Sequence, residues 1–496
     1  MRPASPRRAP ALRRLAVAII TLAVAVAGLS VSGALNASSA PFPAATPQGE
    51  CRGPQDALET SIQGRVPLAD YLNGRFRRGY RCNTVQVARQ GTSGGFKVLR
   101  YRDSLGNVCA FYDSTLLFPR DVLFNATRGL GVVVLDMNNP ARPRQVATLT
   151  SPAMLSPHES LLLNQKRGLL GAVLGNPATN VGIFDLYDVR TNCRKPRLLS
   201  STTAGLLGHE SGWTPDGRTF YSASAGGETL VAIDVSDPTK PRRIFTQRGV
   251  SYHGLRVSNN GRYLYVANLG TRTGAVNLTG LRVLDVSEIQ DRMPNPSVEI
   301  ISDLTWPEIS IPQVAEPFTR RGRKYLLEVD EYSDFERGLG AAATVGAGRI
   351  IDINNIEKPK VVSHLRLAVH QPGARAGNQT LDPGASIPVQ GYAGHYCSVP
   401  YRRNPKIVAC SMIVSGLRIF DIRNLERPRE VGYFNVPSAP GANTLNPTAL
   451  GAFAMSQPTW DLANKSIWYS DGNSGFYVVK LAGGIQKLLK RRLVRR

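Results

Sequence analysis

The sequence is poor in cysteine and histidine, with six of each among 496 residues. No two cysteines form a Cys-x-x-Cys pair, which argues against a zinc ribbon. The sequence also lacks a Gly-x-Ser-x-Gly elbow, a Walker loop, a Gly-x-Gly-x-x-Gly turn and a His-Glu-x-x-His helix. These absences give no support to the serine hydrolase, nucleotide-binding and zincin classes. Any chemistry must therefore come from residues that the fold brings together.

Long apolar runs are also absent, except at the N-terminus. Four arginines (Arg7, Arg8, Arg13 and Arg14) precede an apolar run from Leu15 to Leu29, and small residues at Ser38 to Ala40 offer a cleavage site. This order predicts an export signal over residues 1–40. The alternative is an uncleaved membrane anchor, because the apolar run is long for a signal peptide. Either way, we expect a secreted or cell-surface protein.

Acidic residues are few, with 36 Asp and Glu against 60 Lys and Arg, which gives a net charge of +24. The first forty residues contribute five arginines and no acid, so a cleaved chain stays strongly basic. Such a chain favours anionic partners. The cations are scattered without a nucleic-acid motif, so no specific nucleic acid is expected. The basic C-terminal tail, residues 482–496, could contact an anionic membrane surface, or it could simply be a frayed end.

In an exported chain, six cysteines predict disulfide bonds. Cys397 and Cys410 lie six residues on either side of a predicted hairpin turn at Arg403-Asn404, so we expect them to pair across two antiparallel strands. The remaining four cysteines can pair in more than one way.

Glycine (47) and proline (34) are abundant, and short apolar runs recur between turn residues. Six of these runs carry an Asp that leads into a turn, often rich in proline, as in Val132–Pro143 and Val231–Pro241, and a seventh, degenerate copy has Lys480 in that position. The repeated aspartates are Asp136, Asp185, Asp234, Asp285, Asp352 and Asp421. Their spacing starts near fifty residues and grows later, which is typical of a four-stranded propeller blade with insertions. We expect each Asp to accept backbone hydrogen bonds in the turn that follows it.

The third copy shows the four predicted strands most clearly. They lie near Gly212-Trp213, Thr219–Ala223, Leu230–Val235 and Arg243–Thr246. At the N-terminal end, strands are predicted near Thr84–Ala88, Phe96–Arg100 and Cys109–Tyr112, and we assign all three to the first blade.

The run Val132-Val-Val-Leu-Asp136 and its copies resemble the LVIVD repeat family of exported or surface-associated bacterial proteins. The resemblance covers residues 80–481 and implies an all-β fold, a seven-bladed β-propeller. Six blades are clear, and the seventh is expected to close from both ends of the chain. Residues 41–80, with Cys51 and Cys82, form a predicted disulfide-tied lead-in, and residues 81–481 form the propeller. The family motif says little about activity.

Four of the six histidines occupy one slot, at the predicted start of a blade's innermost strand. His158, His209, His253 and His395 fill it in four blades, and Glu316 and Gln457 fill it in two others. Innermost strands line the central channel of a propeller, so we expect these side chains to form a ring at one mouth. His158, His209, His253, His395 and Glu316 are the predicted metal ligands.

A ring of imidazoles with a carboxylate suits a transition metal such as copper, zinc or iron. The geometry is similar to that of selenium-binding proteins, seven-bladed propellers that include copper-dependent methanethiol oxidases. None of their longer motifs is present. The plainer interpretation is a polar ring that satisfies backbone groups and water in a wet channel.

Long connections are predicted at the same mouth, and long loops on one face are typical of binding or catalysis. They include 268–280, 330–348, 366–394 and 435–456. Asp330, Glu331 and Asp334 lie in one of them and, with Glu316, are candidate ligands or proton-transfer groups, although a solvated acidic loop is an equal alternative.

Three functions remain open. The first is a binding module for a small molecule, protein or glycan with a histidine-lined, metal-holding pocket. The second is a copper- or iron-dependent oxidase, and the third is a cell-surface adhesion scaffold. The sequence does not decide whether the protein is an enzyme.

Overall fold

A computed structural model describes residues 42–114, 130–174, 182–206, 208–270, 279–306, 311–331, 345–374, 391–436 and 452–490. The predicted signal (1–40), Asp334 and the last six residues of the basic tail lie outside this set, as do most of the long predicted loops. No helix in the described ranges is long and apolar enough to cross a membrane.

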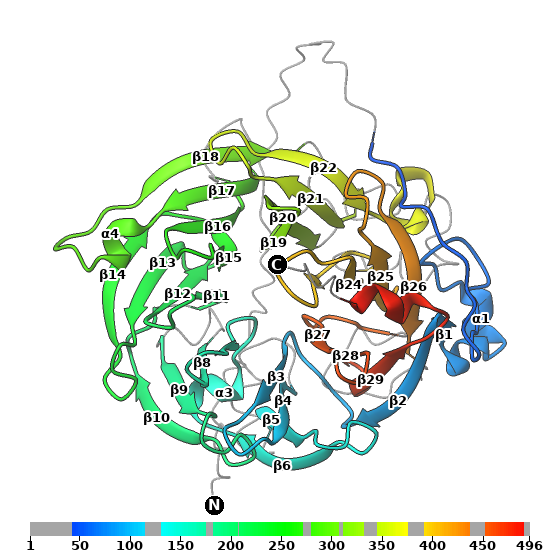
Figure 1. The fold of residues 1–496 in the computed structure, drawn as a ribbon, viewed down its shortest axis with the longest axis horizontal. Coiled ribbons are helices and arrows are strands. Elements are labelled where there is room, and N and C mark those ends of the chain that lie inside the picture. Colours follow the sequence, from blue (N-terminus) through cyan, green and yellow to red (C-terminus); the bar gives the residue numbers. More distant parts are fainter. Residues whose placement is uncertain are drawn as a thin grey trace, which may run out of the picture. The chain divides into compact units, whose positions relative to one another are not determined.

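Seven small antiparallel sheets stand in a ring within the described residues, and together they make a seven-bladed β-propeller (Figure 1). The fold class is as predicted. The innermost strands of neighbouring blades pack against one another, as β11 does on β15 and β15 on β19.

The first four blades each take four consecutive strands. The first holds β3 (Val98–Arg102), β4 (Val108–Asp113), β5 (Val132–Asp136) and β6 (Arg144–Leu149). The second holds β7 (Leu162–Asn164), β8 (Leu169–Val173), β9 (Phe184–Asp188) and β10 (Arg197–Thr202). The third holds β11 (Glu210–Trp213), β12 (Thr219–Ser224), β13 (Thr229–Asp234) and β14 (Arg242–Arg248). The fourth holds β15 (Tyr252–Val257), β16 (Tyr263–Asn268), β17 (Gly280–Asp285) and β18 (Glu299–Thr305).

The last three blades follow the same order, and two of them gain a strand from the N-terminal part of the chain. The fifth holds β19 (Ile311–Arg320), β20 (Arg323–Glu331), β21 (Gly348–Asp352) and β22 (Lys360–Leu365). The sixth holds β23 (Tyr396–Ser398), β24 (Ile407–Ser411), β25 (Leu417–Asp421) and β26 (Arg429–Asn435), with β1 (Tyr80–Cys82) added beside β26. The seventh holds β27 (Thr459–Asp461), β28 (Ser466–Asp471) and β29 (Gly475–Leu481), with β2 (Thr84–Gln90) as its outer strand.

The helices among the described residues are short. The α-helices are α1 (Leu68–Leu72), α3 (Pro152–Leu155) and α4 (Ser287–Gln290), and the 3-10 turns are η1 (Arg75–Arg78), η2 (Ala368–His370), η3 (Pro372–Ala374) and η4 (Ile485–Leu489).

Ring closure from both ends is confirmed, with one correction. Strand β2 pairs with β29 from Thr84–Leu481 to Gln90–Phe476, so the predicted strand near Thr84–Ala88 belongs to the seventh blade and not to the first. The physical reason is the number of strands that each blade already holds. The first blade already has four strands in β3–β6, whereas the C-terminal part of the chain supplies only three strands and leaves the outer edge of β29 unpaired.

The repeated Asp acts as predicted in five copies. For example, Asp136 accepts a hydrogen bond from the backbone N–H of Asn138 at 3.0 Å, and Asp352 accepts one from that of Asn354 at 2.9 Å. In the second blade the prediction named the wrong residue. Strand β9 ends at Asp188, which accepts the N–H of Arg190 at 2.8 Å. Asp185 lies inside the strand and accepts the N–H of Ala153 at 2.8 Å.

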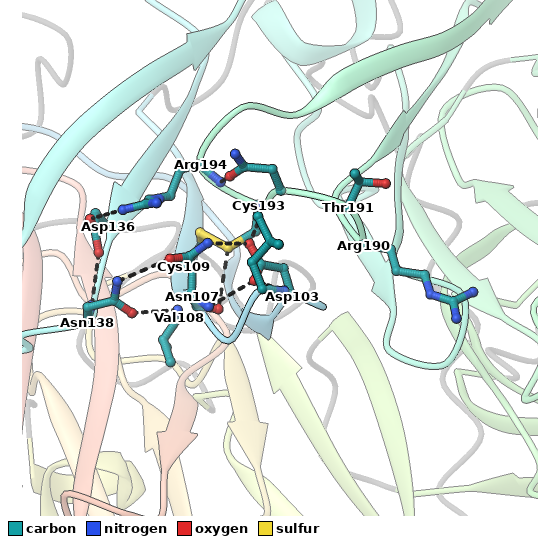
Figure 2. The surroundings of a disulfide bond; sticks show 12 residues. Asp103, Asn107, Val108, Cys109, Asp136, Asn138, Arg190, Thr191, Cys193 and Arg194 are labelled. Carbon is teal, nitrogen blue, oxygen red and sulfur yellow. Dashed lines mark hydrogen bonds and ion pairs between the residues drawn. A yellow bond between two sulfur atoms is a disulfide. The ribbon is translucent and has the colours of Figure 1, made fainter.

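Three disulfide bonds join the six cysteines. Cys397 pairs with Cys410 as predicted, and the two residues are direct partners across β23 and β24. Cys51 pairs with Cys82. Cys109 of β4 pairs with Cys193, which follows β9, so this bond ties the first blade to the second (Figure 2). The Asp103 carboxylate accepts the N–H of Cys193 at 2.9 Å beside the same bond.

Candidate functional site

Four histidines stand at the same end of four innermost strands. His209 and His395 immediately precede β11 and β23, His253 is the second residue of β15, and His158 lies between α3 and β7. Parallel placement around the ring brings them to one mouth. The ring centroids of His158 and His209 lie 4.4 Å apart, as do those of His209 and His253.

Two carboxylates complete the cluster. Glu159 places one oxygen 3.3 Å from His209 Nε2 and its other oxygen 3.1 Å from His395 Nε2. Glu331 places its two oxygens 3.2 Å from His253 Nε2 and 3.1 Å from His395 Nε2. We call these six residues, His158, Glu159, His209, His253, Glu331 and His395, the six-residue cluster.

Backbone carbonyls fix the orientation of two rings. The Nδ1 of His253 lies 2.8 Å from the carbonyl oxygen of Pro312, and the Nδ1 of His395 lies 2.6 Å from that of Met455. A carbonyl can only accept, so both Nδ1 atoms carry hydrogen. The Nε2 atoms of the neutral rings therefore turn their lone pairs toward the centre, which is the arrangement found in metal-binding histidines.

Several buried polar atoms of the cluster lack a hydrogen-bond partner. Among the described residues, His158 Nδ1, Glu159 Oε2 and His395 Nε2 have none in acceptable geometry. The Nε2 atoms of His209 and His253 form a hydrogen bond of 2.7 Å, in which neutral His253 accepts because its Nδ1 carries the hydrogen. The carboxylate oxygens of Glu159 and Glu331 lie close to these rings, and acceptors buried together in this way favour a cation among them.

Without a metal, protons must supply that positive charge. Burial lowers the pKa of His395, but its interactions with Glu159 and Glu331 outweigh burial and raise the pKa to about 9. Burial and the neighbouring His209 hold the pKa of His158 well below its usual range. Burial raises the pKa of the Glu159 carboxyl, yet His209 and His395 more than reverse this. The cluster is thus a buried site of negative potential that attracts a cation.

Access to the cluster is restricted. The His209 side chain is 20% exposed, whereas those of His253, His395, Glu159 and Glu331 are 5% exposed or less. Phe96 packs against the cluster, with its ring 4.5 Å from that of His158 and 5.3 Å from that of His395. An incoming ligand would therefore reach the cluster beside His209.

The other predicted site residues fall in different places. Glu331 is in the cluster, but Glu316 is held by Arg256 Nε at 3.0 Å and by Arg402 Nε at 2.9 Å. The predicted start of the innermost strand is wrong in this blade, because β19 already begins at Ile311. The backbone oxygen of Pro312, and not the side chain of Glu316, therefore contacts His253. Asp330 also points away from the cluster, because its two oxygens accept from Arg349 at 2.9 and 2.8 Å.

Glu159 was missed by the slot pattern. Consecutive residues of a regular strand point to opposite faces, so the residue after a channel-facing histidine is expected to point away. His158 has a positive φ of 50°, which breaks this alternation, and both His158 and Glu159 reach the cluster. The only signal in the sequence was the recurrence of His-Glu-Ser at residues 158–160 and 209–211.

A second buried layer lies next to the cluster. The Glu210 carboxylate accepts from Lys97 Nζ at 2.7 Å, from Arg256 Nη1 at 2.5 Å and from the Tyr396 hydroxyl. Burial lowers the pKa of Lys97 to about 8, although Glu210 opposes the shift. These charges pair with one another across different blades, so they hold the innermost strands together without joining the cluster.

No protein-family model matches the chain, and no curated protein matches it. Many solved structures resemble it in outline. Two candidate 6-phosphogluconolactonases, from Bacteroides fragilis and Bacteroides uniformis, are each 12% identical, with TM-scores of 0.45 and 0.47. Each covers 68% of this chain, over 83% and 84% of their own lengths. Hydrazine synthase of Kuenenia stuttgartiensis is 12% identical, with a TM-score of 0.47 over 80% of this chain and 97% of its own. Likeness at this level says nothing about activity.

Proposed function

We propose that this protein is an exported propeller of the LVIVD type that binds one transition-metal ion in the six-residue cluster. The supporting observation is the spacing of the donor atoms. Two ligands that lie about 2.1 Å from a metal, at right angles, are about 3.0 Å from each other. The contacts between Nε2 atoms and carboxylate oxygens include distances of 3.1, 3.1, 3.2 and 3.3 Å.

The donor set favours iron over the other two candidate metals. Imidazole nitrogens suit zinc, copper(II) and iron alike, so the carboxylates carry this preference. The donor atoms fall into two groups that share Glu159, one with His158 and His209 and the other with Glu331 and His395. Imidazole nitrogens combined with carboxylates suit an iron(II) ion. The charges of Glu159 and Glu331 would balance the charge of a divalent ion.

Elemental analysis of the purified protein tests this proposal. We expect close to one metal ion per chain in the wild type and loss of that metal when His209 and His253 are both changed to Ala. His364→Gln is the matched control, because it removes a half-buried histidine that lies outside the cluster. A wild-type protein that takes up no iron, copper or zinc after removal of metal and reloading would overturn the proposal, as would full uptake by the double variant.

A metal-dependent oxidase is the second candidate, supported by the partial exposure of His209. Exposure on one side leaves room for a small exogenous molecule to reach the metal. Azide added to the iron-loaded protein, after oxidation of the metal to iron(III), would report an open position through a new charge-transfer absorption band. Absence of any spectral change on azide addition would favour a closed binding site with no oxidase role.

A further inference from the structure

A groove of about 820 Å³ lies between the fifth and sixth blades, far from the six-residue cluster. Strand β19 starts beside the cluster, where Pro312 contacts His253, and ends at Arg320 in the groove. Eight residues of extended strand separate those points by roughly 25 Å. The groove therefore opens on the face of the propeller that carries the repeated Asp turns.

Cations dominate the lining of this groove. Arg320, Arg321, Arg323, Lys360 and Arg423 line it, against only Asp352 and Glu426. Asp352 is already paired with Arg323 at 2.8 Å. Arg423 is also paired, with Asp421 at 2.7 Å. Among the described residues no carboxylate forms an ion pair with Arg321 or Lys360, so these two line the groove as cations that the chain does not neutralise.

Arg320 is held in place without an acidic partner. Its guanidinium donates to the backbone oxygens of Pro405 and Arg423, both at 3.1 Å. Burial, together with the neighbouring charge of Arg321, lowers the pKa of Arg320, against the opposing pull of Asp421. Two or more cations crowded at one spot gain stability when an anion binds between them.

Arg321 occupies a turn position that normally selects Asn or Gly. Its φ is 49° and that of the next residue, Gly322, is 82°, which are values of a two-residue hairpin turn. A contact with the neighbouring blade stabilises this backbone conformation, since the Asn404 side chain accepts a hydrogen bond from the N–H of Arg321 at 2.6 Å. A strained arginine, fixed across two blades and facing a groove, points to a binding role.

We propose that this groove binds a ligand that carries phosphate or sulfate esters, through Arg321 and Lys360, with the charges of Arg320 and Arg423 beside them. Guanidinium groups match such oxyanions because they donate two parallel hydrogen bonds. The volume lies within the range of small-molecule sites, and the exposed arginines leave room for a longer anionic chain to continue past it. This site is separate from the metal site and does not depend on it.

Isothermal titration calorimetry at 150 mM NaCl tests the proposal with two probes. Inorganic pyrophosphate stands for phosphate esters, and a heparin-derived sulfated tetrasaccharide stands for sulfate esters. We expect at least one probe to bind with a sub-millimolar Kd and the Arg321→Asn/Arg423→Gln double variant to weaken that binding at least tenfold. Asn is chosen because it tolerates a positive φ. The probe that binds identifies the source of the ester.

A matched control removes two cations elsewhere on the same face. Arg144→Ala/Arg242→Ala changes residues that begin β6 and β14, beside Asp136 and Asp234, outside the groove. This control should stay within twofold of the wild type, and Lys360→Ala alone should weaken binding as a second, independent groove variant. Failure of both probes to bind the wild type, or an equal loss in the control, would overturn the proposal. Metal content should be unchanged in every variant, which separates this result from the metal proposal.

Discussion

The Glu159 carboxylate is the acid of the six-residue cluster that lies near three histidines, with oxygens 3.3, 3.9 and 3.1 Å from the Nε2 atoms of His209, His253 and His395. Glu159→Gln keeps the size of the side chain and removes its charge. We expect iron affinity to fall at least tenfold, because a buried cation loses one of its two compensating charges. Competition with a chromogenic chelator measures the change.

Glu316→Gln is the control for that experiment. Glu316 is also a glutamate of an innermost strand, but its oxygens contact Arg256 and Arg402 instead of the histidines. Iron affinity should remain within threefold of the wild type in this variant. An equal loss of affinity in both variants would mean that net charge, and not ligation by Glu159, controls metal uptake.

His364 gives the chain a specific weakness in acid. Burial and the cations of Arg349 and Arg366 lower its pKa to about 3, against 6.5 for an ordinary histidine. As pH falls below 6.5, the unfolded chain takes up a proton that the folded chain does not, so stability falls with pH between 6.5 and 3. His364→Gln should remove this contribution, about 1 kcal/mol at pH 5 once solvent screening is allowed for.

Urea unfolding at pH 5 and pH 7 measures this effect. The stability difference between variant and wild type should shift in favour of the variant at pH 5 relative to pH 7. No shift between the two pH values would show that the imidazole is protonated in the folded protein after all.

At the same residue scale, the sequence predicted the four histidines and Glu331 but not Glu159. The histidines were visible because each stands at the start of an innermost strand, and strand starts repeat along the chain. Glu159 depends on one positive φ at His158, which no periodic pattern reveals. Glu316 was placed wrongly because the start of β19 depends on its pairing with β20. The sequence of one strand alone does not reveal where that pairing begins.

At the scale of elements, Gly254 shows how closely two innermost strands approach. A Cβ at this position of β15 would lie 2.1 Å from the backbone oxygen of Gln313 and 2.7 Å from Glu210 Cγ. Gly254→Ala must therefore push β15 away from β19. We expect a loss of about 1–3 kcal/mol in the free energy of unfolding, with weaker metal binding because His253 is the adjacent residue.

Gly373→Ala is the matched control for that change. An added Cβ there meets no atom within 4 Å, so neither stability nor metal binding should fall. Thermal unfolding with a parallel iron titration reads out both effects. Unchanged stability in Gly254→Ala would show that the two strands can separate without cost.

Strands were more predictable than their partners. All four strands of the third blade were expected within a few residues of β11–β14, because Asp-Gly and Pro turns mark their ends. The partner of β2 was not predictable in the same way. Its apolar pattern suits any outer edge, and only the ring as a whole decides that it pairs with β29, almost four hundred residues away.

At the scale of the whole molecule, the propeller closes where β2 pairs with β29, and β1 adds a second link between the N-terminal part of the chain and β26. Neighbouring blades share buried contacts, as in the apolar cluster of the sixth and seventh blades that includes Phe434 and Tyr477. Every blade therefore depends on a complete ring for the burial of both its faces. The Cys109–Cys193 bond ties only the first blade to the second and cannot replace closure.

Truncation separates closure from the local stability of blades. A chain that ends at Ser474 loses β29, which leaves β2 unpaired and β28 paired with β27 alone. We expect this chain to lose the cooperative thermal transition of the full protein, because the seventh blade cannot form and its neighbours expose apolar faces. A chain that ends at Lys490 keeps every described strand and should melt as the full chain does. A cooperative transition in the shorter chain, within a few degrees of the control, would mean that six blades suffice and that β2 is an accessory to the ring.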